Sequence, residues 1–408
     1  MAISSNFDNL PKEIMSEIML RLPAESLMQF KSVNKSFHSF VSSLVEDPKF
    51  VAKHLRFSEA DLSTPTYFLT YGLCPRRNSR VQELEFYLKS GVLLLTILSD
   101  RGNKDEKIHC AIEDLSLPLD TVLARKGNPL ILSTVFCLEA YHCNGIICLA
   151  KDGEKIVLYN PTLHKYKTFV LESLSDPWEI LGTGFGWDSR ANEYKFVRIS
   201  CDSNTLIAAV FDFGTNHSWR GISIPEYVHS RLYSCVYCKG TCYWLMCSTD
   251  LIISFDMGNE EFHTIHLPDD CQQYEGGALG LTLKDDSVCL FRYPSRPVGR
   301  GQMLESIQMW VMDISSNGGV QACNYSWKKF LTIEHLEEIY YPSTFWKSDE
   351  LLMKTRFGRA VSYNIGTRKL RDLHLPLHGM EVKSIRNPVP FMKSLVPLKA
   401  QRNEKGNK

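Results

Sequence analysis

The stretch that decides the fold runs from residue 10 to residue 57 and reads LPKEIMSEIMLRLPAESLMQFKSVNKSFHSFVSSLVEDPKFVAKHLRF. Its apolar residues recur at helical spacing, and proline divides it, so it predicts three short amphipathic helices. Pro11 stands at a favourable helix start, Pro23 ends the first helix and opens the second, and Asn34 is expected to cap the third. A unit of this length has too little core to be stable alone, so its apolar faces need a partner.

This stretch resembles the F-box. The matching positions are Leu10, Pro11, Glu13, Ile14, Ile18, Leu22, Pro23, Leu27, Phe30, Lys31, Val33 and Lys35, with Pro48 and Phe50 in the tail of the motif. Phe37 departs from the tryptophan of many plant members but keeps an aromatic core residue. The alternative is an ordinary helical cap on a larger domain, and the two Leu-Pro pairs at this spacing favour the F-box.

The resemblance implies a partner and a division of the chain. F-box proteins dock on a Skp-type adaptor, and through it on cullin and RING subunits of a ubiquitin ligase, and they present a substrate bound elsewhere. We expect residues 1–57 to be the adaptor-binding module, 58–398 the substrate-binding domain and 399–408 a basic, disordered tail. The residues expected to be buried partly within the module and partly against the adaptor are Leu10, Pro11, Ile14, Ile18, Leu22, Pro23, Leu27, Phe30 and Val33.

Composition places the chain among soluble globular proteins, since 44% of its 408 residues are hydrophobic and 23% are charged. The N-terminus lacks the basic start and apolar core of a signal peptide, and the most apolar run, 92–98, is too short to span a bilayer. The 13 cysteines are therefore expected to be reduced and mostly buried. We expect a cytoplasmic protein, with the nucleus as the alternative, and no membrane partner.

From about residue 66 to residue 398 the pattern changes to short β-rich runs. A recurring unit has a strand ending in Asp or Asn, a turn, and a second strand that opens near an aromatic or basic residue. The marks are Asn160, Asp212, Asp256, Asp313 and Asn364, which lie 52, 44, 57 and 51 residues apart by subtraction of their numbers. Periods of about 40–50 residues are typical of four-stranded propeller blades. We therefore predict a mainly β chain with a small α module followed by a kelch-like β-propeller. The number of blades stays open because residues 66–140 are weakly patterned, and a β-sandwich is the alternative.

Several segments of this part resemble the F-box-associated repeats of plants. They include HCNGIICL (142–149), LYNP (158–161), MWVMD (309–313) and SLVPL (394–398). Their order and spacing are closest to the S-locus F-box family, over nearly the whole chain. That resemblance implies a pollen protein of gametophytic self-incompatibility, which recognises non-self S-RNases and directs them to ubiquitin-dependent degradation. Related F-box proteins share the repeats without that role, so a generic substrate receptor stays open.

Charge is unevenly distributed although the total is zero. Residues 172–286 hold 17 acidic and 7 basic side chains, a net of −10. A basic partner such as an S-RNase would be steered towards such a surface, whereas the simpler interpretation is a solvated acidic surface without a partner. The tentative substrate-binding residues are Asp202, Asp250, Glu260, Glu261, Asp269, Asp270, Glu275, Asp285 and Asp286.

Other kinds of site are disfavoured. Cys235, Cys238, Cys242 and Cys247 form a single CxxC with two further cysteines on an expected hairpin, which favours buried strand residues over zinc. Gly182, Gly184 and Gly186 lack the lysine of a P-loop and are interpreted as strand-ending glycines. No catalytic motif is recognisable, and the pI of about 7.1 disfavours nucleic-acid binding. We expect no cofactor, no metal and no catalysis; the rivals are a scaffold acting outside the ligase and a sugar-processing propeller enzyme.

Overall fold

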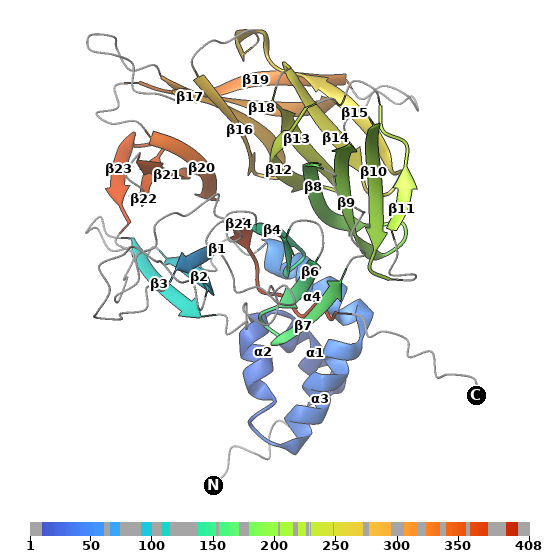
Figure 1. Cartoon of the computed structure of the whole chain (residues 1–408). Helices are drawn as coiled ribbons and strands as arrows, with labels where there is room; N and C mark the ends of the chain where they lie inside the picture. Colours follow the sequence, from blue (N-terminus) through green and yellow to red (C-terminus); the bar gives the residue numbers. More distant parts are fainter. Residues whose placement is uncertain are drawn as a thin grey trace, which may run out of the picture.

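The structure is a computed structural model. It describes residues 10–60, 66–73, 91–99, 108–114, 138–151, 155–170, 179–202, 205–214, 219–225, 228, 230–247, 249–271, 277–294, 306–315, 324–334, 340–355, 360–373 and 389–398. The expected tail 399–408 lies outside the described residues. A small helical module is followed by a ring of β-sheets (Figure 1).

The helical module contains the three expected helices, α1 (Lys12–Leu20), α2 (Ala24–Phe30) and α3 (Lys35–Glu46). Pro11 and Pro23 occupy the N-cap positions of α1 and α2, where a missing amide hydrogen costs nothing. The Asn34 side chain accepts a hydrogen bond from the Phe37 amide at 2.9 Å, which confirms the predicted cap of α3.

A fourth helix, α4 (Pro48–Ala60), was not expected. Asp47 accepts a hydrogen bond from the Lys49 amide at 2.9 Å, and Pro48 is the first helical residue, so the helix has a local start signal. It packs against α1 and α3, and the buried His54 ring contacts the Leu22 carbonyl oxygen through Nε2 at 2.9 Å. The helix continues through residue 57, where we expected the module to end.

The β part consists of six four-stranded antiparallel sheets among the described residues. From the innermost to the outermost strand they are β24 (Val389–Phe391), β1 (Thr66–Leu73), β2 (Gly91–Ser99), β3 (His109–Asp114); β4 (Leu138–Cys143), β5 (Ile146–Lys151), β6 (Lys155–Asn160), β7 (Lys165–Val170); β8 (Glu179–Asp188), β9 (Glu193–Asp202), β10 (Thr205–Asp212), β11 (Trp219–Ile222); β12 (Leu232–Cys238), β13 (Thr241–Met246), β14 (Leu251–Asp256), β15 (Glu261–His266); β16 (Gly277–Lys284), β17 (Ser287–Pro294), β18 (Ile307–Ser315), β19 (Asn324–Ile333); and β20 (Tyr340–Lys347), β21 (Glu350–Thr355), β22 (Ala360–Asn364), β23 (Lys369–Asp372). One 3₁₀ turn, η1 (Asp269–Cys271), follows β15.

These sheets form a closed ring, which confirms the predicted β-propeller and excludes the β-sandwich (Figure 1). Each sheet contacts the next through its innermost strand, in the order β24, β4, β8, β12, β16, β20 and back to β24. Five sheets carry the recurring Asn or Asp mark on their third strand. The sixth combines β1, β2 and β3 with β24 from the far end of the chain, so the ring is closed by pairing distant segments.

The recurring Asn and Asp residues have a local structural role. Asp256 Oδ1 accepts hydrogen bonds from the amides of Gly258 at 2.7 Å and Asn259 at 2.8 Å, and Asn364 Oδ1 accepts one from Thr367 at 2.7 Å. Asn160 Oδ1 likewise accepts one from Leu163 at 3.2 Å. An Asx turn of this kind closes the hairpin between the third and fourth strands, which explains the regular spacing of the marks.

The two ends of the strands differ in their surroundings. At one end lie the turns between first and second strands and between third and fourth strands; Leu163, in the turn after β6, packs there against the helical module. We call this the module end. Because neighbouring strands are antiparallel, the other connections of each sheet lie at the opposite end, which we call the far end.

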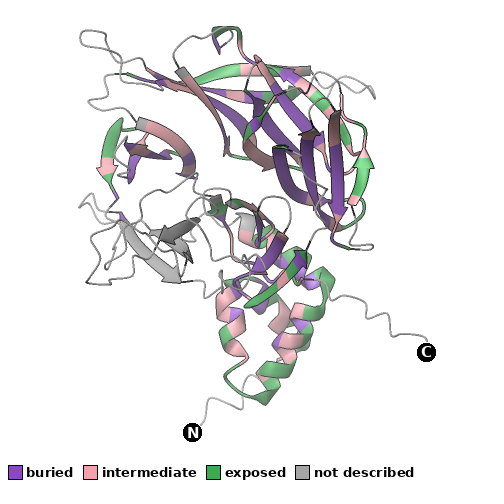
Figure 2. Cartoon of the chain, in the orientation of Figure 1, coloured by how far each residue is buried: buried purple, intermediate pink, exposed green. Residues whose placement is uncertain are grey.

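Hydrophobic cores fill the spaces between adjacent sheets, and buried residues line the facing strands (Figure 2). Gly182, Gly184 and Gly186 lie inside β8, so their interpretation as strand-ending glycines was wrong. A Cβ on Gly184 would lie 2.7 Å from the Trp244 ring, and one on Gly186 would lie 2.3 Å from the Tyr237 ring. The glycines are there because the neighbouring sheet packs directly against the backbone of β8.

Among the helices in the described part of the chain, none combines the length and apolar character that a membrane crossing requires.

Candidate functional site

The helical module closes its own core with only some of the predicted adaptor-binding residues. Leu27 is 1% exposed and packs with Met19, Leu20 and Val41. It is therefore held in the core and is not available to a partner. Leu10, Leu22 and Phe30 are half-buried, and the Phe30 ring stacks on the Phe37 ring with centroids 5.6 Å apart.

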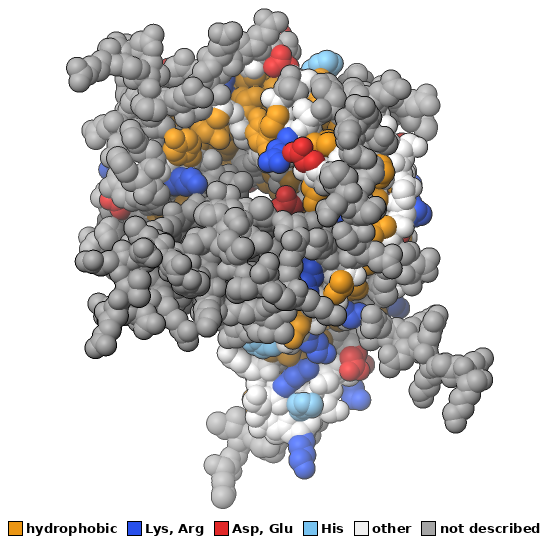
Figure 3. All heavy atoms as spheres, in the orientation of Figure 1, with side chains coloured by type: hydrophobic (Ala, Val, Ile, Leu, Met, Phe, Trp, Pro, Cys, Tyr) orange, Lys and Arg blue, Asp and Glu red, His pale blue; other side chains and the backbone are white. Residues whose placement is uncertain are grey.

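The other predicted residues lie on the surface of the module. Ile14 is 49% exposed, Ile18 is 39% exposed and Val33 is 60% exposed, while Pro11 and Pro23 are also exposed. Ile14 and Ile18 are one turn apart on α1, so they share a face of that helix. On the side of the molecule visible in Figure 3, the module at the bottom displays Lys, Arg and His side chains. The exposed isoleucine and valine side chains supply apolar surface for a partner.

The tentative acidic residues do not gather on one face. Asp285 and Asp286 form the turn between β16 and β17, and Glu260 and Glu261 stand at the turn between β14 and β15, all at the module end. The far end holds a second group, which consists of Asp202, Asp250, Asp269 and Asp270. Asp202 is the last residue of β9 and its side chain is not described, and Glu275 lies outside the described residues. The acidic segment 172–286 is therefore divided between two surfaces.

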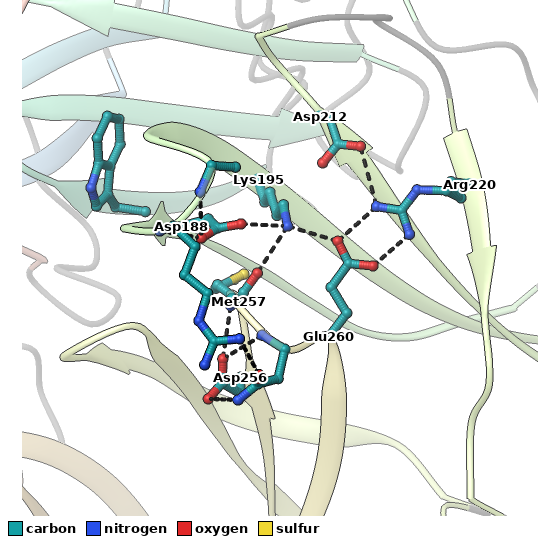
Figure 4. Close-up of polar contacts among 12 residues, drawn as sticks. Asp188, Lys195, Asp212, Arg220, Asp256, Met257 and Glu260 are labelled. Carbon is teal, nitrogen blue, oxygen red and sulfur yellow. Dashed lines mark hydrogen bonds and ion pairs between the residues drawn. The ribbon is translucent and has the colours of Figure 1, made fainter.

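Glu260 has a structural role within the propeller (Figure 4). Its carboxylate pairs with Lys195 Nζ at 2.7 Å and with both terminal nitrogens of Arg220, and Lys195 also pairs with Asp188 at 2.7 Å. The hydrogen bond from Arg220 is the main reason that the pKa of Glu260 is lowered. This carboxylate is already neutralised by partners from sheet β8–β11, so it is a poor candidate for binding a basic substrate.

The cysteine-rich hairpin forms as expected from β12 and β13. The Cys242 thiol lies 3.8 Å from the Phe185 carbonyl oxygen of one neighbouring sheet, whereas the Cys238 thiol lies 3.2 Å from the Asp286 carbonyl oxygen of the other. Burial raises the pKa of both Cys235 and Cys238, so these thiols stay protonated. Within the described ranges, no group of three or more His, Cys, Asp or Glu side chains could hold a metal ion.

One contribution to the module was missed from the sequence. Leu395, near the C-terminal end of the described chain, is 1% exposed and belongs to the core of the helical module, with Leu163 and Val396 packed against that core. The segment SLVPL was noticed only as part of a family resemblance. Its apolar residues gave no indication that they would pack against helices more than 330 residues earlier in the chain.

Known proteins show the same two parts. The family model described as "F-box domain" matches residues 7–48, and the model described as "F-box associated beta propeller domain" matches residues 108–397. An F-box/kelch-repeat protein of Arabidopsis thaliana is 28% identical over 400 residues, which cover 95% of each chain. A putative F-box protein of the same plant is 25% identical over 298 residues, covering 69% of this chain and 72% of the relative.

Solved structures are more distant. A chain from a nidogen/laminin complex aligns with a TM-score of 0.42 and 11% sequence identity, covering 81% of this chain and 99% of the other, and this likeness carries no argument about function. The propeller model, by contrast, covers more than half of the chain and coincides with the ring of sheets seen in the structure. The chain therefore belongs to the F-box proteins that carry an F-box-associated β-propeller.

Proposed function

We propose that this chain is the substrate receptor of an SCF-type cullin ubiquitin ligase. Residues 1–57, extended by the end of α4, bind a Skp-type adaptor, and the propeller within 58–398 binds the protein to be ubiquitinated. The observation that carries the proposal is the exposure of Ile14, Ile18 and Val33 on a module that already has a closed core. Fold and family together support a binding subunit, and the catalytic chemistry then belongs to other subunits.

The adaptor surface can be tested by replacing Ile14 and Ile18 with Asp in the full-length chain. Both side chains are exposed, so the module should fold, while two charges would stand where apolar contact is required. We expect the Kd for a purified Skp-type adaptor to rise at least 100-fold. Val170→Asp is the matched control, because Val170 is also an exposed apolar residue but lies on the outer strand β7. Adaptor binding at wild-type strength by the double variant would contradict the proposal.

We infer an S-RNase taken up by the pollen tube as the substrate, which would place the protein in the pollen cytosol. The S-locus resemblance of the propeller motifs and the net charge of −10 over residues 172–286 support this choice. The alternatives are an unrelated substrate and a scaffold outside the ligase. Co-purification of adaptor and cullin distinguishes a receptor from a scaffold, and expression restricted to pollen distinguishes the S-locus role from a generic receptor.

The division of the acidic residues between two ends makes the electrostatic part testable. Asp269→Lys with Asp270→Lys reverses charge at the far end, and Asp285→Lys with Asp286→Lys reverses the same charge at the module end. All four residues are exposed. If the far end meets a basic S-RNase, only the first pair should slow association, and the difference should shrink as salt rises. Equal association rates for both pairs at low salt would remove the far-end charges from recognition.

A further inference from the structure

The described chain ends in a segment, residues 392–398, that lies between the helical module and the propeller (Figure 1). Leu395 enters the core of the module, while Val396 and Leu398 pack against the core between sheets β4–β7 and β8–β11. Lys393 also forms an ion pair with Glu25, in the first turn of α2. One short segment therefore contacts both parts of the protein.

The propeller holds this segment through a buried amide. The Asn160 side chain donates hydrogen bonds to the Ser394 carbonyl oxygen at 3.1 Å and to the Val396 carbonyl oxygen at 2.7 Å. Both Asn160 and Ser394 are fully buried, and the Ser394 hydroxyl donates to the Asn144 carbonyl oxygen at 2.7 Å. These buried polar groups are paired only when the segment is in place, so its displacement would leave them unsatisfied.

The packing leaves no room for another arrangement of the backbone at this point. Gly145 has a φ of +79°, and a Cβ there would lie 2.0 Å from Ser394 Oγ. Immediately before the segment, β24 pairs with β1 and closes the ring. The Met392 amide faces His142 Nε2 at 3.5 Å, and the Phe391 ring lies edge-on to the His142 ring with centroids 5.0 Å apart. The segment is thus anchored on the innermost strands of two sheets.

We propose that residues 392–398 position the helical module on the propeller and thereby set the direction in which the adaptor-binding surface faces relative to the substrate-binding domain. Asn160, Leu395 and Lys393 are the positioning residues. The segment supplies apolar core to a module that is too small to bury enough of its own. The inference about direction within a ligase rests on the proposed function, whereas the mechanical link between the two parts does not.

The first test compares Asn160→Ala with Asn364→Ala in the full-length chain. Both residues cap the same kind of turn, but the Asn364 amide bonds only to Asp349 and Glu350 of its own sheet. Hydrogen exchange read by mass spectrometry should rise at least tenfold in residues 24–30 and 389–398 for Asn160→Ala only. X-ray scattering should show a larger radius of gyration for that variant. Equal exchange in residues 24–30 and superimposable scattering curves for the two variants would overturn the proposal.

The second test keeps the proposal open to refutation if Asn160→Ala fails to fold. Glu25→Lys and Lys393→Glu each place like charges together, and the double exchange restores an opposite pair. We expect each single variant to raise exchange in α2 about threefold and the double variant to return to within twofold of wild type. Wild-type exchange in both single variants, or no recovery in the double variant, would contradict a positioning contact.

A ligase assay distinguishes failure of this inference from failure of the proposed function. With purified adaptor, cullin and RING subunits, mass spectrometry identifies which propeller lysines become ubiquitinated. A changed set of lysines in Asn160→Ala, with the wild-type set in Asn364→Ala, is the result expected of a positioning role. The same set in both variants contradicts it. If even the wild-type chain captures no adaptor, the proposed function fails, while the exchange and scattering results still decide whether the segment links the two parts.

Discussion

Replacing Lys195 by Met tests how strongly buried ion pairs join sheets β8–β11 and β12–β15 (Figure 4). Lys195 Nζ lies 2.7 Å from Asp188 Oδ2, 2.7 Å from Glu260 Oε1 and 3.0 Å from the Met257 carbonyl oxygen. The side chains of Lys195 and Asp188 are 6% and 2% exposed, so neither charge has much access to water. Methionine has a similar length and no charge, and it would leave both carboxylates without this partner.

The expected loss follows from what remains. Removing one partner of a buried ion pair costs about 3–5 kcal/mol because the other charge stays buried. Asp188 keeps hydrogen bonds from the amides of Arg190 and Ala191, and Glu260 keeps Arg220, so we expect the lower value of about 3 kcal/mol. For a cooperative unit of roughly 150–250 residues this corresponds to a fall in Tm of about 6–12 °C.

Thermal unfolding followed by circular dichroism and tryptophan fluorescence measures the change. The matched control is Lys53→Met, which breaks the pair with Glu17 on the module, where both side chains are more than half exposed. An exposed pair contributes about 0–1 kcal/mol, so the control should lower Tm by less than about 4 °C. If Lys195→Met lowers Tm no more than the control does, buried ion pairing does not stabilise this junction.

Gly184→Ala should destabilise the propeller by about 1–3 kcal/mol through overpacking, whereas Gly221→Ala, where a Cβ meets nothing within 4 Å, should leave the urea midpoint unchanged; equal midpoints for the two would contradict the packing of β8. Asn34→Ala should cost about 1 kcal/mol and speed hydrogen exchange in the first turn of α3, and unchanged exchange there would show that the cap is dispensable. Stability should also fall in acid. Burial raises the pKa of Asp188, but hydrogen bonds from Lys195 and two backbone amides outweigh it, and the net shift is downward; the pKa of Glu260 is lowered chiefly by Arg220. Folded-state pKa values below the unfolded ones mean that this stabilisation is present above about pH 4 and is lost as pH falls through the folded values. Tm measured from pH 7 to pH 3 checks this, and a Tm that falls no more steeply in wild type than in Lys195→Met would refute it.

Local patterns were sufficient for the helices and for five of the six sheets. Proline at positions 11 and 23 and Asn34 predicted where three helices begin, because capping depends on residues within one turn. The spaced Asn and Asp marks predicted five hairpins for the same reason, since an Asx turn is formed by the residue itself and the amides that follow it.

The division of the module surface could be predicted only in part. Periodicity placed Ile14, Ile18 and Leu27 on apolar faces, but it does not tell which face meets the core of the chain and which is left for a partner. In the structure Leu27 is buried while Ile14 and Ile18 are exposed, because α3, α4 and Leu395 cover one side of the helices.

The amino-acid sequence by itself determined the two-part organisation, the helix starts, the repeated hairpins and the family of the chain. The tertiary structure alone decided that β24 completes the sixth sheet, that Leu395 joins the core of the module and that the acidic residues divide between two ends of the propeller. The physical reason is the distance along the chain over which each interaction acts. Turns and caps depend on near neighbours, whereas ring closure and the packing of the module depend on contacts between segments hundreds of residues apart, for which no local pattern exists.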